Sequence, residues 1–199
     1  MPPRALLALD IVLKVMLVVL LGLAVAFPDS AQFAGKAMGA RALTYPLAAL
    51  VVPLVWWFGA RHHRFPVEVD VLAVLPFLID TAGNALDLYD SVDWWDDANH
   101  LVNWAILTGA AGFALRPLGL HWLNQAGLAT GFGAVTAIIW EVLEYFAFIR
   151  NSPELATAYT DTLGDLALGV TGSVISALSV AVLFRRPRAI TRSGAPPGV

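Results

Sequence analysis

Cysteine is absent from the 199-residue chain, which excludes a disulfide framework and a thiolate metal site. Charge is scarce as well, because 14% of the residues are charged where a soluble domain has about a quarter. The formal net charge of −3 offers no basic excess and argues against nucleic acid as a partner. Hydrophobic residues make up 58% of the chain, and this composition indicates a protein whose main partner is the lipid bilayer.

Long apolar runs follow one another along the chain, and each is long enough to cross a hydrocarbon core of about 30 Å. We therefore predict an all-α, polytopic membrane protein with one transmembrane domain over residues 1–184 and about six helices. Prolines in the expected connections support these limits. The predicted helices cover residues 5–27, 42–59, 69–89, 96–115, 122–149 and 155–184. Residues 185–199 are arginine-rich and then rich in Ser, Gly and Pro, which predicts a basic, then disordered, cytoplasmic tail.

The first apolar run also has features of a signal peptide, with Arg4 ahead of it and the small residues 24–26 at its end. Asp10 and Lys14 lie inside this run, which is unusual for a signal peptide, so we expect a retained first helix. The two residues are four positions apart and share a helix face. We interpret them as a structural ion pair, with a functional relay as the alternative.

The basic residues predict the orientation of the helices. With the N-terminus in the cytoplasm and six crossings, eight Lys and Arg residues fall on the inner side and three on the outer side. The opposite orientation would reverse this bias. We expect both termini inside and a multi-pass location in the cytoplasmic (inner) membrane.

The acidic residues concentrate at the outer end of the last four predicted helices. Residues three or four positions apart share a helix face, so each helix presents one polar stripe, and we expect the stripes to face a common interior. The stripes comprise Asp80, Asn84 and Asp87; Asp96, Asp97, His100 and Asn103; Glu141, Glu144 and Tyr145; and Asp161 and Asp165. The hairpins 69–115 and 122–184 both place acids at the outer turn, which suggests a pseudo-repeat of two hairpins.

An acid at the centre of a transmembrane helix costs about 2.5–3.5 kcal/mol, so several of them need protons, cations, a polar ligand or water. Oxygen ligands with one imidazole suit a divalent cation such as Mg, Mn, Ca or Zn. The predicted metal ligands are Asp97, His100, Glu141, Glu144, Asp161 and Asp165. For Asp96, a role at the helix N-terminus is as good an interpretation as a ligand role.

General acid–base chemistry is the alternative use of such a site, because close carboxylates repel and one of them then holds a proton. The predicted catalytic residues are Glu141, Glu144 and Asp165, and the predicted substrate-binding residues are Asp80, Asn84, Asp87, Asn103 and Tyr145. No E-x-x-H motif is present, and the spacing does not choose between the two chemistries. Small residues in the last helix, Gly169 to Ser176, predict close helix packing.

Four stretches of the chain resemble a known family: Asp80-Thr-Ala-Gly-Asn84, Trp95-Asp-Asp-Ala-Asn-His100, Trp140-Glu-Val-Leu-Glu-Tyr145 and Tyr159-Thr-Asp-Thr-Leu-Gly-Asp165. Together they are similar to the bacterial YjdF-like inner-membrane family and, more distantly, to the VanZ-like family. VanZ-like members typically carry Lys and Gln where this chain has Asp97 and Glu144. The resemblance implies a polytopic envelope protein with these acids as site candidates, and it implies no reaction.

The leading hypothesis is a membrane protein with an outer-leaflet acidic pocket that binds a divalent cation and acts on a lipid-linked or cell-envelope substrate. A cation or proton transporter is the first alternative, and it predicts polar groups that continue to the cytoplasmic side. A non-catalytic membrane scaffold is the second. The oligomeric state does not follow from the sequence.

Overall fold

The computed structural model describes residues 3–185 and is helical throughout, with no strand in that range. A π-helical turn at Trp56–Ala60 follows the third helix, and short 3₁₀ turns lie at Arg116–Leu118, Ile149–Asn151 and Pro153–Ala156. The α-helices are α1 (Pro3–Ala26), α2 (Met38–Ala49), α3 (Val51–Val55), α4 (Val67–Ala85), α5 (Leu88–Ser91), α6 (Trp95–Leu115), α7 (Trp122–Ala147) and α8 (Ala158–Leu183).

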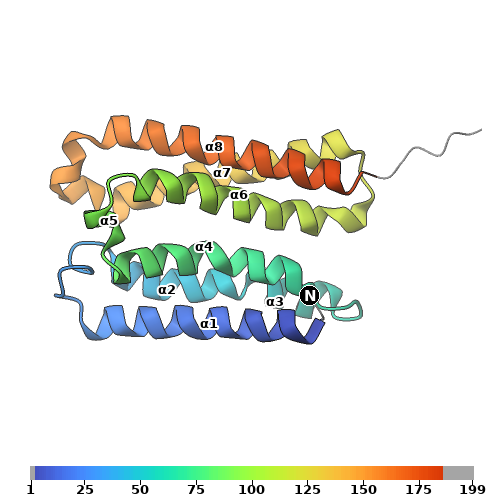
Figure 1. Ribbon diagram of the computed structural model, residues 1–199, viewed down its shortest axis with the longest axis horizontal. Coiled ribbons are helices and arrows are strands. Elements are labelled where there is room, and N and C mark those ends of the chain that lie inside the picture. The colour runs from blue at the N-terminus through green and yellow to red at the C-terminus, as the bar shows by residue number, and fades with distance from the viewer. Residues whose placement is uncertain (1–2, 186–199) are drawn as a thin grey trace, which may run out of the picture.

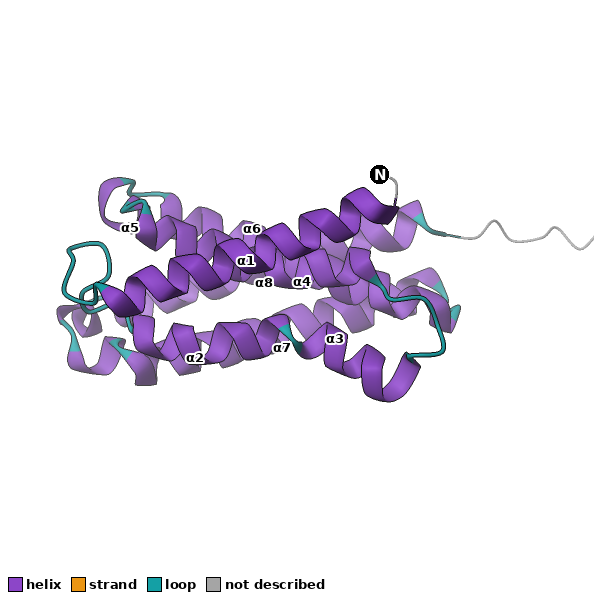
Figure 2. Cartoon of the chain, turned by 90° about the horizontal axis from the view of Figure 1, so that it is seen from below, coloured by secondary structure: helices purple, strands orange, loops and turns teal. Residues whose placement is uncertain are grey.

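The long helices form two groups of three that run roughly parallel to one axis (Figure 1). One group holds α1, α2 with α3, and α4, and the other holds α6, α7 and α8; α4 packs on α6 and so joins the groups. Figure 2, which views the bundle from below, shows α1 alongside α2. The first and last described residues lie at one end of this bundle, which we call the terminal end. Helix α5 lies at the opposite end, which we call the acidic end because the acids described below gather there.

By length and apolar composition, five helical segments can cross a membrane: Arg4–Ala26, Met38–Ala60, Trp95–Leu118, Trp122–Asn151 and Ala158–Leu183. Helix α4 differs because Glu68, Asp70 and Asp80 all fall within its 19 residues. Large apolar side chains cover the outside of the bundle, and Ile11, Phe58 and Ile138 are each more than half exposed. Such an exterior suits lipid and not water. The prediction of an all-helical membrane protein is therefore confirmed, while the count of six crossings stays a prediction.

The helix limits have local causes. Pro53 lacks the N–H that would bond the Ala49 carbonyl, so the helix is interrupted at Leu50, between α2 and α3. The predicted helix 69–89 ends earlier, at Ala85, because Asp87 takes a left-handed conformation with φ of 60°. The helix predicted over 42–59 starts earlier, at Met38, which places Arg41 inside it and not in an outer loop. The predicted tail, except Arg185, lies outside the described residues.

Small residues let α6, α7 and α8 approach closely, as predicted for Gly169 to Ser176. A Cβ added at Gly172 would overlap the backbone carbonyl of Leu101 in α6. Ser173 accepts a hydrogen bond from Thr108 at 3.0 Å and lies against Gly133 of α7. The close contact matters for the site, because these three helices carry most of its acidic residues.

Candidate functional site

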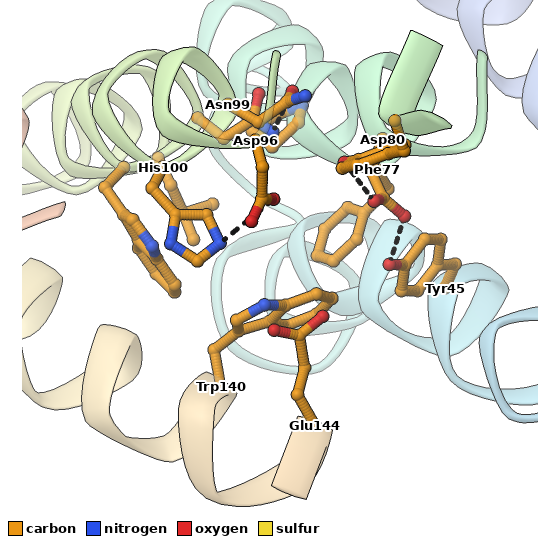
Figure 3. Close-up of a pocket in the computed structure, with 13 residues that line it drawn as sticks. Tyr45, Phe77, Asp80, Asp96, Asn99, His100, Trp140 and Glu144 are labelled. Carbon is orange, nitrogen blue, oxygen red and sulfur yellow. Dashed lines mark hydrogen bonds and ion pairs between the residues drawn. The ribbon is translucent and has the colours of Figure 1, made fainter. Parts of the chain in front are cut away.

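A buried imidazole lies at the acidic end of the bundle and faces carboxylates from three helices. His100 of α6 places Nδ1 3.0 Å from Asp165 of α8 and 3.6 Å from Glu141 of α7. Its Nε2 lies 3.8 Å from Asp96, one turn earlier on α6 (Figure 3). His100, Glu141 and Asp165 are 7%, 6% and 4% exposed. We call these four residues the His100 cluster.

The spacing of these atoms fits a shared metal ion. Two donors about 2.0–2.1 Å from one ion lie roughly 2.8–3.4 Å apart in octahedral or tetrahedral geometry. Ligand atoms of Asp96, His100 and Asp165 lie within 4.8 Å of one another, and so do those of His100, Glu141 and Glu144. The Nδ1 atom of His100 is enclosed, and although Asp165 lies 3.0 Å away, Nδ1 forms no well-aligned hydrogen bond with any described residue. An enclosed nitrogen without a partner is costly unless it meets a ligand.

A second group of polar residues lies on the other side of the site, around Asp80 of α4. Arg41 donates to Asp80 Oδ2 at 3.0 Å, and Tyr45 donates to the same oxygen at 2.5 Å. Tyr89, just beyond the membrane-spanning helices, donates to Oδ1 at 2.7 Å. Burial, followed by the Asp80 charge, raises the pKa of Tyr89, so this phenol remains a donor. Every oxygen of Asp80 therefore has a partner, and we call this set the Arg41 cluster.

Glu144 connects the two clusters. Its carboxylate lies 3.5 Å from Arg41 Nη2, and the Arg41 side chain is 10% exposed. Across both clusters, five carboxylates face one guanidinium and one imidazole. Even with the imidazole protonated, three negative charges lack a partner, although Asp96 is partly solvated. The site therefore attracts cations.

A cavity of about 60 Å³ separates the clusters, which is room for a few water molecules or one hydrated ion. Figure 3 shows Asp96 and His100 of α6 on one side of it, Asp80 and Tyr45 on another, and Trp140 and Glu144 of α7 below. The Oδ1 atom of Asn103, another lining residue, is buried without a partner among the described residues. Its unused acceptor suggests that the cavity holds water or a polar ligand.

The structure brings some of the residues singled out in the sequence together and leaves others apart. His100, Glu141, Glu144 and Asp165 meet at the site, and Asp80 and Asn103 line the cavity. Asn84 is buried, but its amide bonds the Asp80 carbonyl of its own helix. The predicted ligands Asp97 and Asp161 and the predicted substrate contacts Asp87 and Tyr145 are exposed.

Two contributors did not follow from the sequence, and the role of a third was left open. Asp96, for which a ligand role and a role at the helix N-terminus were equally good interpretations, faces His100 at the i, i+4 spacing, while its neighbour Asp97, the predicted ligand, is exposed. Arg41 and Tyr45 come from a helix whose polar residues show no stripe toward the acids. Their role follows only from how α2 packs on α4.

A separate charged group lies nearer the terminal end, between α1 and α4. Lys14 lies 3.0 Å from Asp10 and 2.5 Å from Asp70. The predicted Asp10–Lys14 ion pair is confirmed, and Asp70, which is fully buried, is an added member. Each carboxylate has one oxygen, Oδ1, that is buried without a hydrogen-bond partner among the described residues. Lys14 thus balances one of two buried negative charges.

Lys14→Met is expected to lower the free energy of unfolding by about 2 kcal/mol, because it leaves two buried carboxylates unpaired. The partial exposure of Lys14 keeps the loss below that of a fully buried pair. The measurement is thermal unfolding in detergent followed by tryptophan fluorescence. Glu68→Gln, an exposed acid on the same turn of α4, is the control and should change nothing. Adding Asp70→Asn to Lys14→Met should restore part of the loss. No recovery in the double variant would refute the electrostatic cause.

Comparison with known proteins gives one match, to the family model described as predicted membrane protein (DUF2238), over residues 9–186. The chain belongs to the DUF2238 family. The matched range contains the His100 cluster, the Arg41 cluster and all the candidate membrane-spanning segments except the first residues of α1. No curated protein and no solved structure matches the chain. The match therefore supports a membrane protein and assigns no chemistry to the site.

Proposed function

We propose that this DUF2238 protein holds a divalent cation at the acidic end of its helix bundle. Asp96, His100 and Asp165 are the ligands, a group whose ligand atoms all lie within 4.8 Å of one another, with Glu141 and Glu144 beside them. The observation that carries the proposal is the buried His100 Nδ1, which makes no well-aligned hydrogen bond although carboxylates of α7 and α8 lie 3.0–3.6 Å away. An acidic cluster alone would not suffice, since carboxylates also occur as solvated groups. A buried imidazole nitrogen that faces carboxylates from two helices without a well-aligned hydrogen bond adds a second, independent sign of a ligand.

The donor set narrows the choice of ion. Mg²⁺ and Ca²⁺ prefer sites built from oxygen alone, whereas an imidazole among carboxylates suits Zn²⁺ or Mn²⁺ better. A bound ion would also offset the negative charge that the two clusters leave unbalanced. Zn²⁺ and Mn²⁺ are therefore the first of the four candidate ions to test.

The cavity suggests what the ion would do. Of the three residues proposed as catalytic, Glu144 lines the cavity, Asp165 serves better as a ligand, and Glu141 lies beside His100. A divalent ion lowers the pKa of a bound water, and a carboxylate such as Glu144 is placed to accept its proton. We propose hydrolysis or transfer on the polar part of a lipid-linked or cell-envelope substrate, which reaches the cavity from the membrane. The YjdF-like resemblance accords with the family match, and the VanZ-like resemblance suggests envelope lipids as the substrate class.

The membrane placement belongs to the same proposal. Helix α4 is the sixth crossing, the termini lie in the cytoplasm, and the acidic end faces outward across the inner membrane. Support comes from the basic bias of the connections and from both described ends lying at one end of the bundle (Figure 1). The pseudo-repeat of two hairpins stays a prediction. Helix α4 packs on α1 as well as on α6, so the helices group as two sets of three and not as two hairpins.

One observation favours cation or proton transport as a second candidate function. Asp70 and Asp80 lie on the same helix, ten residues or about 15 Å apart, so α4 carries charged groups toward both ends of the bundle. A transporter needs polar groups on both sides of the membrane, and the Lys14–Asp70 pair supplies one in the half opposite the site. Cation flux into proteoliposomes, lost in Asp70→Asn, would establish this alternative.

Metal analysis of the purified protein tests the proposed centre. The wild-type protein, purified without chelator and loaded with Zn²⁺ or Mn²⁺, should retain one ion per chain. His100→Ala should weaken metal affinity by at least about 100-fold, because even loss of an outer-shell partner costs about 10–100-fold. Asp165→Asn should behave in the same way.

Neighbouring aspartates provide the control. Asp97→Asn removes an exposed acid one position from Asp96 and should keep the wild-type stoichiometry. Asp96→Asn should lower the affinity. Equal metal content in all variants would refute the centre, and full function in the amide variants would support the scaffold hypothesis.

A further inference from the structure

A second hollow, of about 770 Å³, lies at the terminal end of the bundle, far from the acidic cavity. Its lining comes from the turn between α6 and α7 and from the end of α8, which lie at the same end of the bundle (Figure 1). Gly119, with φ of +62°, allows the tight turn that opens this space. The residues that line it include Arg116, His121, Trp122 and Arg185.

The hollow is positively charged. Its lining contains two arginines and a histidine and no acid. Neither Arg116 nor Arg185 forms an ion pair with a carboxylate in the part of the chain that the structure describes. Arg41, by contrast, forms ion pairs with Asp80 and Glu144.

Aromatic rings lie beside both exposed guanidinium groups. Arg116 lies over the Phe184 ring at 3.6 Å, and Arg185 lies 5.9 Å from the Trp122 ring. Stacking uses the face of a guanidinium and leaves its N–H edges open. Arg116, stacked on Phe184, and Arg185, near Trp122, therefore keep their N–H donors available to the hollow. Donors in this arrangement match the oxygens of a phosphate group.

The surroundings indicate that the phosphate belongs to a lipid. Leu118, Leu123 and Leu183 each adjoin a lining residue in the sequence and are 65%, 53% and 76% exposed, so exposed apolar side chains alternate with the basic lining along the chain. Trp122 lies at the start of a membrane-crossing segment, where tryptophan favours the headgroup level. A soluble phosphate compound would have no use for this apolar border, whereas acyl chains would cover it.

We propose that the hollow between the α6–α7 turn and the end of α8 binds the phosphate headgroup of an anionic phospholipid. Arg116 and Arg185 bind the phosphate, Trp122 lies at headgroup level, and the exposed leucines contact the acyl chains. Basic pockets between helices at a cytoplasmic surface are a known type of lipid site. The site is independent of the proposed metal centre, because the two share no residue and lie at opposite ends of the bundle.

Thermal unfolding in a neutral detergent tests the proposal, with short-chain phosphatidylglycerol, short-chain phosphatidylcholine and inorganic phosphate as three separate probes. The wild-type melting temperature should rise with phosphatidylglycerol and not with the other two. The double variant Arg116→Gln/Arg185→Gln should keep the wild-type melting temperature without lipid and need at least tenfold more phosphatidylglycerol for the same rise. If the double variant melts at a lower temperature than the wild type without lipid, the single variants Arg116→Gln and Arg185→Gln replace it. Each of them should need several-fold more phosphatidylglycerol for the same rise.

Arg61→Gln/Arg64→Gln is the matched control, since it removes two exposed arginines at the same end of the bundle outside the hollow. It should respond to phosphatidylglycerol as the wild type does. An equal loss in the control would show a diffuse surface effect and overturn the site. Equal stabilisation by phosphatidylcholine would overturn the role of the negative charge, and equal stabilisation by inorganic phosphate would overturn the lipid as its source.

Discussion

Replacing Arg41 by methionine is expected to lower the free energy of unfolding by about 3–5 kcal/mol, the largest loss from any single charge in the described structure. Arg41 is 9% exposed and contacts two carboxylates, Asp80 of α4 at 3.0 Å and Glu144 of α7 at 3.5 Å. Methionine keeps much of the side-chain volume and removes the charge. Two buried acids then lose their counter-ion, although Tyr45 and Tyr89 continue to donate to Asp80.

The control separates charge from shape. Arg150 is exposed at the same end and lies over the Phe146 ring, so Arg150→Met should change stability by less than about 0.5 kcal/mol. Adding Asp80→Asn to Arg41→Met should recover part of the lost stability, because one of the two unpaired charges disappears. Thermal unfolding in detergent measures all three variants. A double variant no more stable than Arg41→Met would contradict an electrostatic role for Arg41.

Gly172→Leu is expected to cost about 3 kcal/mol or more, because the helices have no room for a side chain at this position. Even a Cβ would overlap the Leu101 carbonyl, and a backbone group cannot turn aside as a flexible side chain can. Helices α6 and α8 must then separate. Since α6 carries His100 and α8 carries Asp165, the variant should also weaken the binding of Zn²⁺ or Mn²⁺ at the proposed centre.

Gly127→Leu is the matched comparison, because Gly127 is exposed and a Cβ there meets no atom within 4 Å. Leucine has a higher helix propensity than glycine, so this variant should be as stable as the wild type or slightly more stable. Melting temperature and metal content are measured on both proteins. Equal stability of the two variants would show that the α6–α8 contact tolerates separation.

Prediction from the sequence went further for the helices than for the site. Helix type depends on local apolar length and on prolines, and both can be read directly. Helix limits were less accurate, since the end of α4 depends on the left-handed Asp87 and the start of α2 on the connection before it. Within the site, Glu141 and Asp165 could be singled out because a buried acid in an apolar helix needs a compensating partner.

Adjacent acids were harder to assign. Asp96 and Asp97 have the same composition and nearly the same position, yet one faces His100 and the other is exposed. A helix advances about 100° per residue, so a small rotation of α6 exchanges their roles. That rotation is set by contact with α8, where Gly169 lies against Trp104, and no local pattern reports it.

The sequence by itself determined that the chain is helical, that lipid is its solvent and that its acids gather toward one end. Those properties depend on residue type and on distance along the chain. Only the tertiary structure decided that Arg41 and Tyr45 pair with Asp80, that Lys14 also holds Asp70, and that the two arginines at the other end line a hollow. Each of these contacts joins different helices, and the rotation and packing of the helices determine which side chains meet.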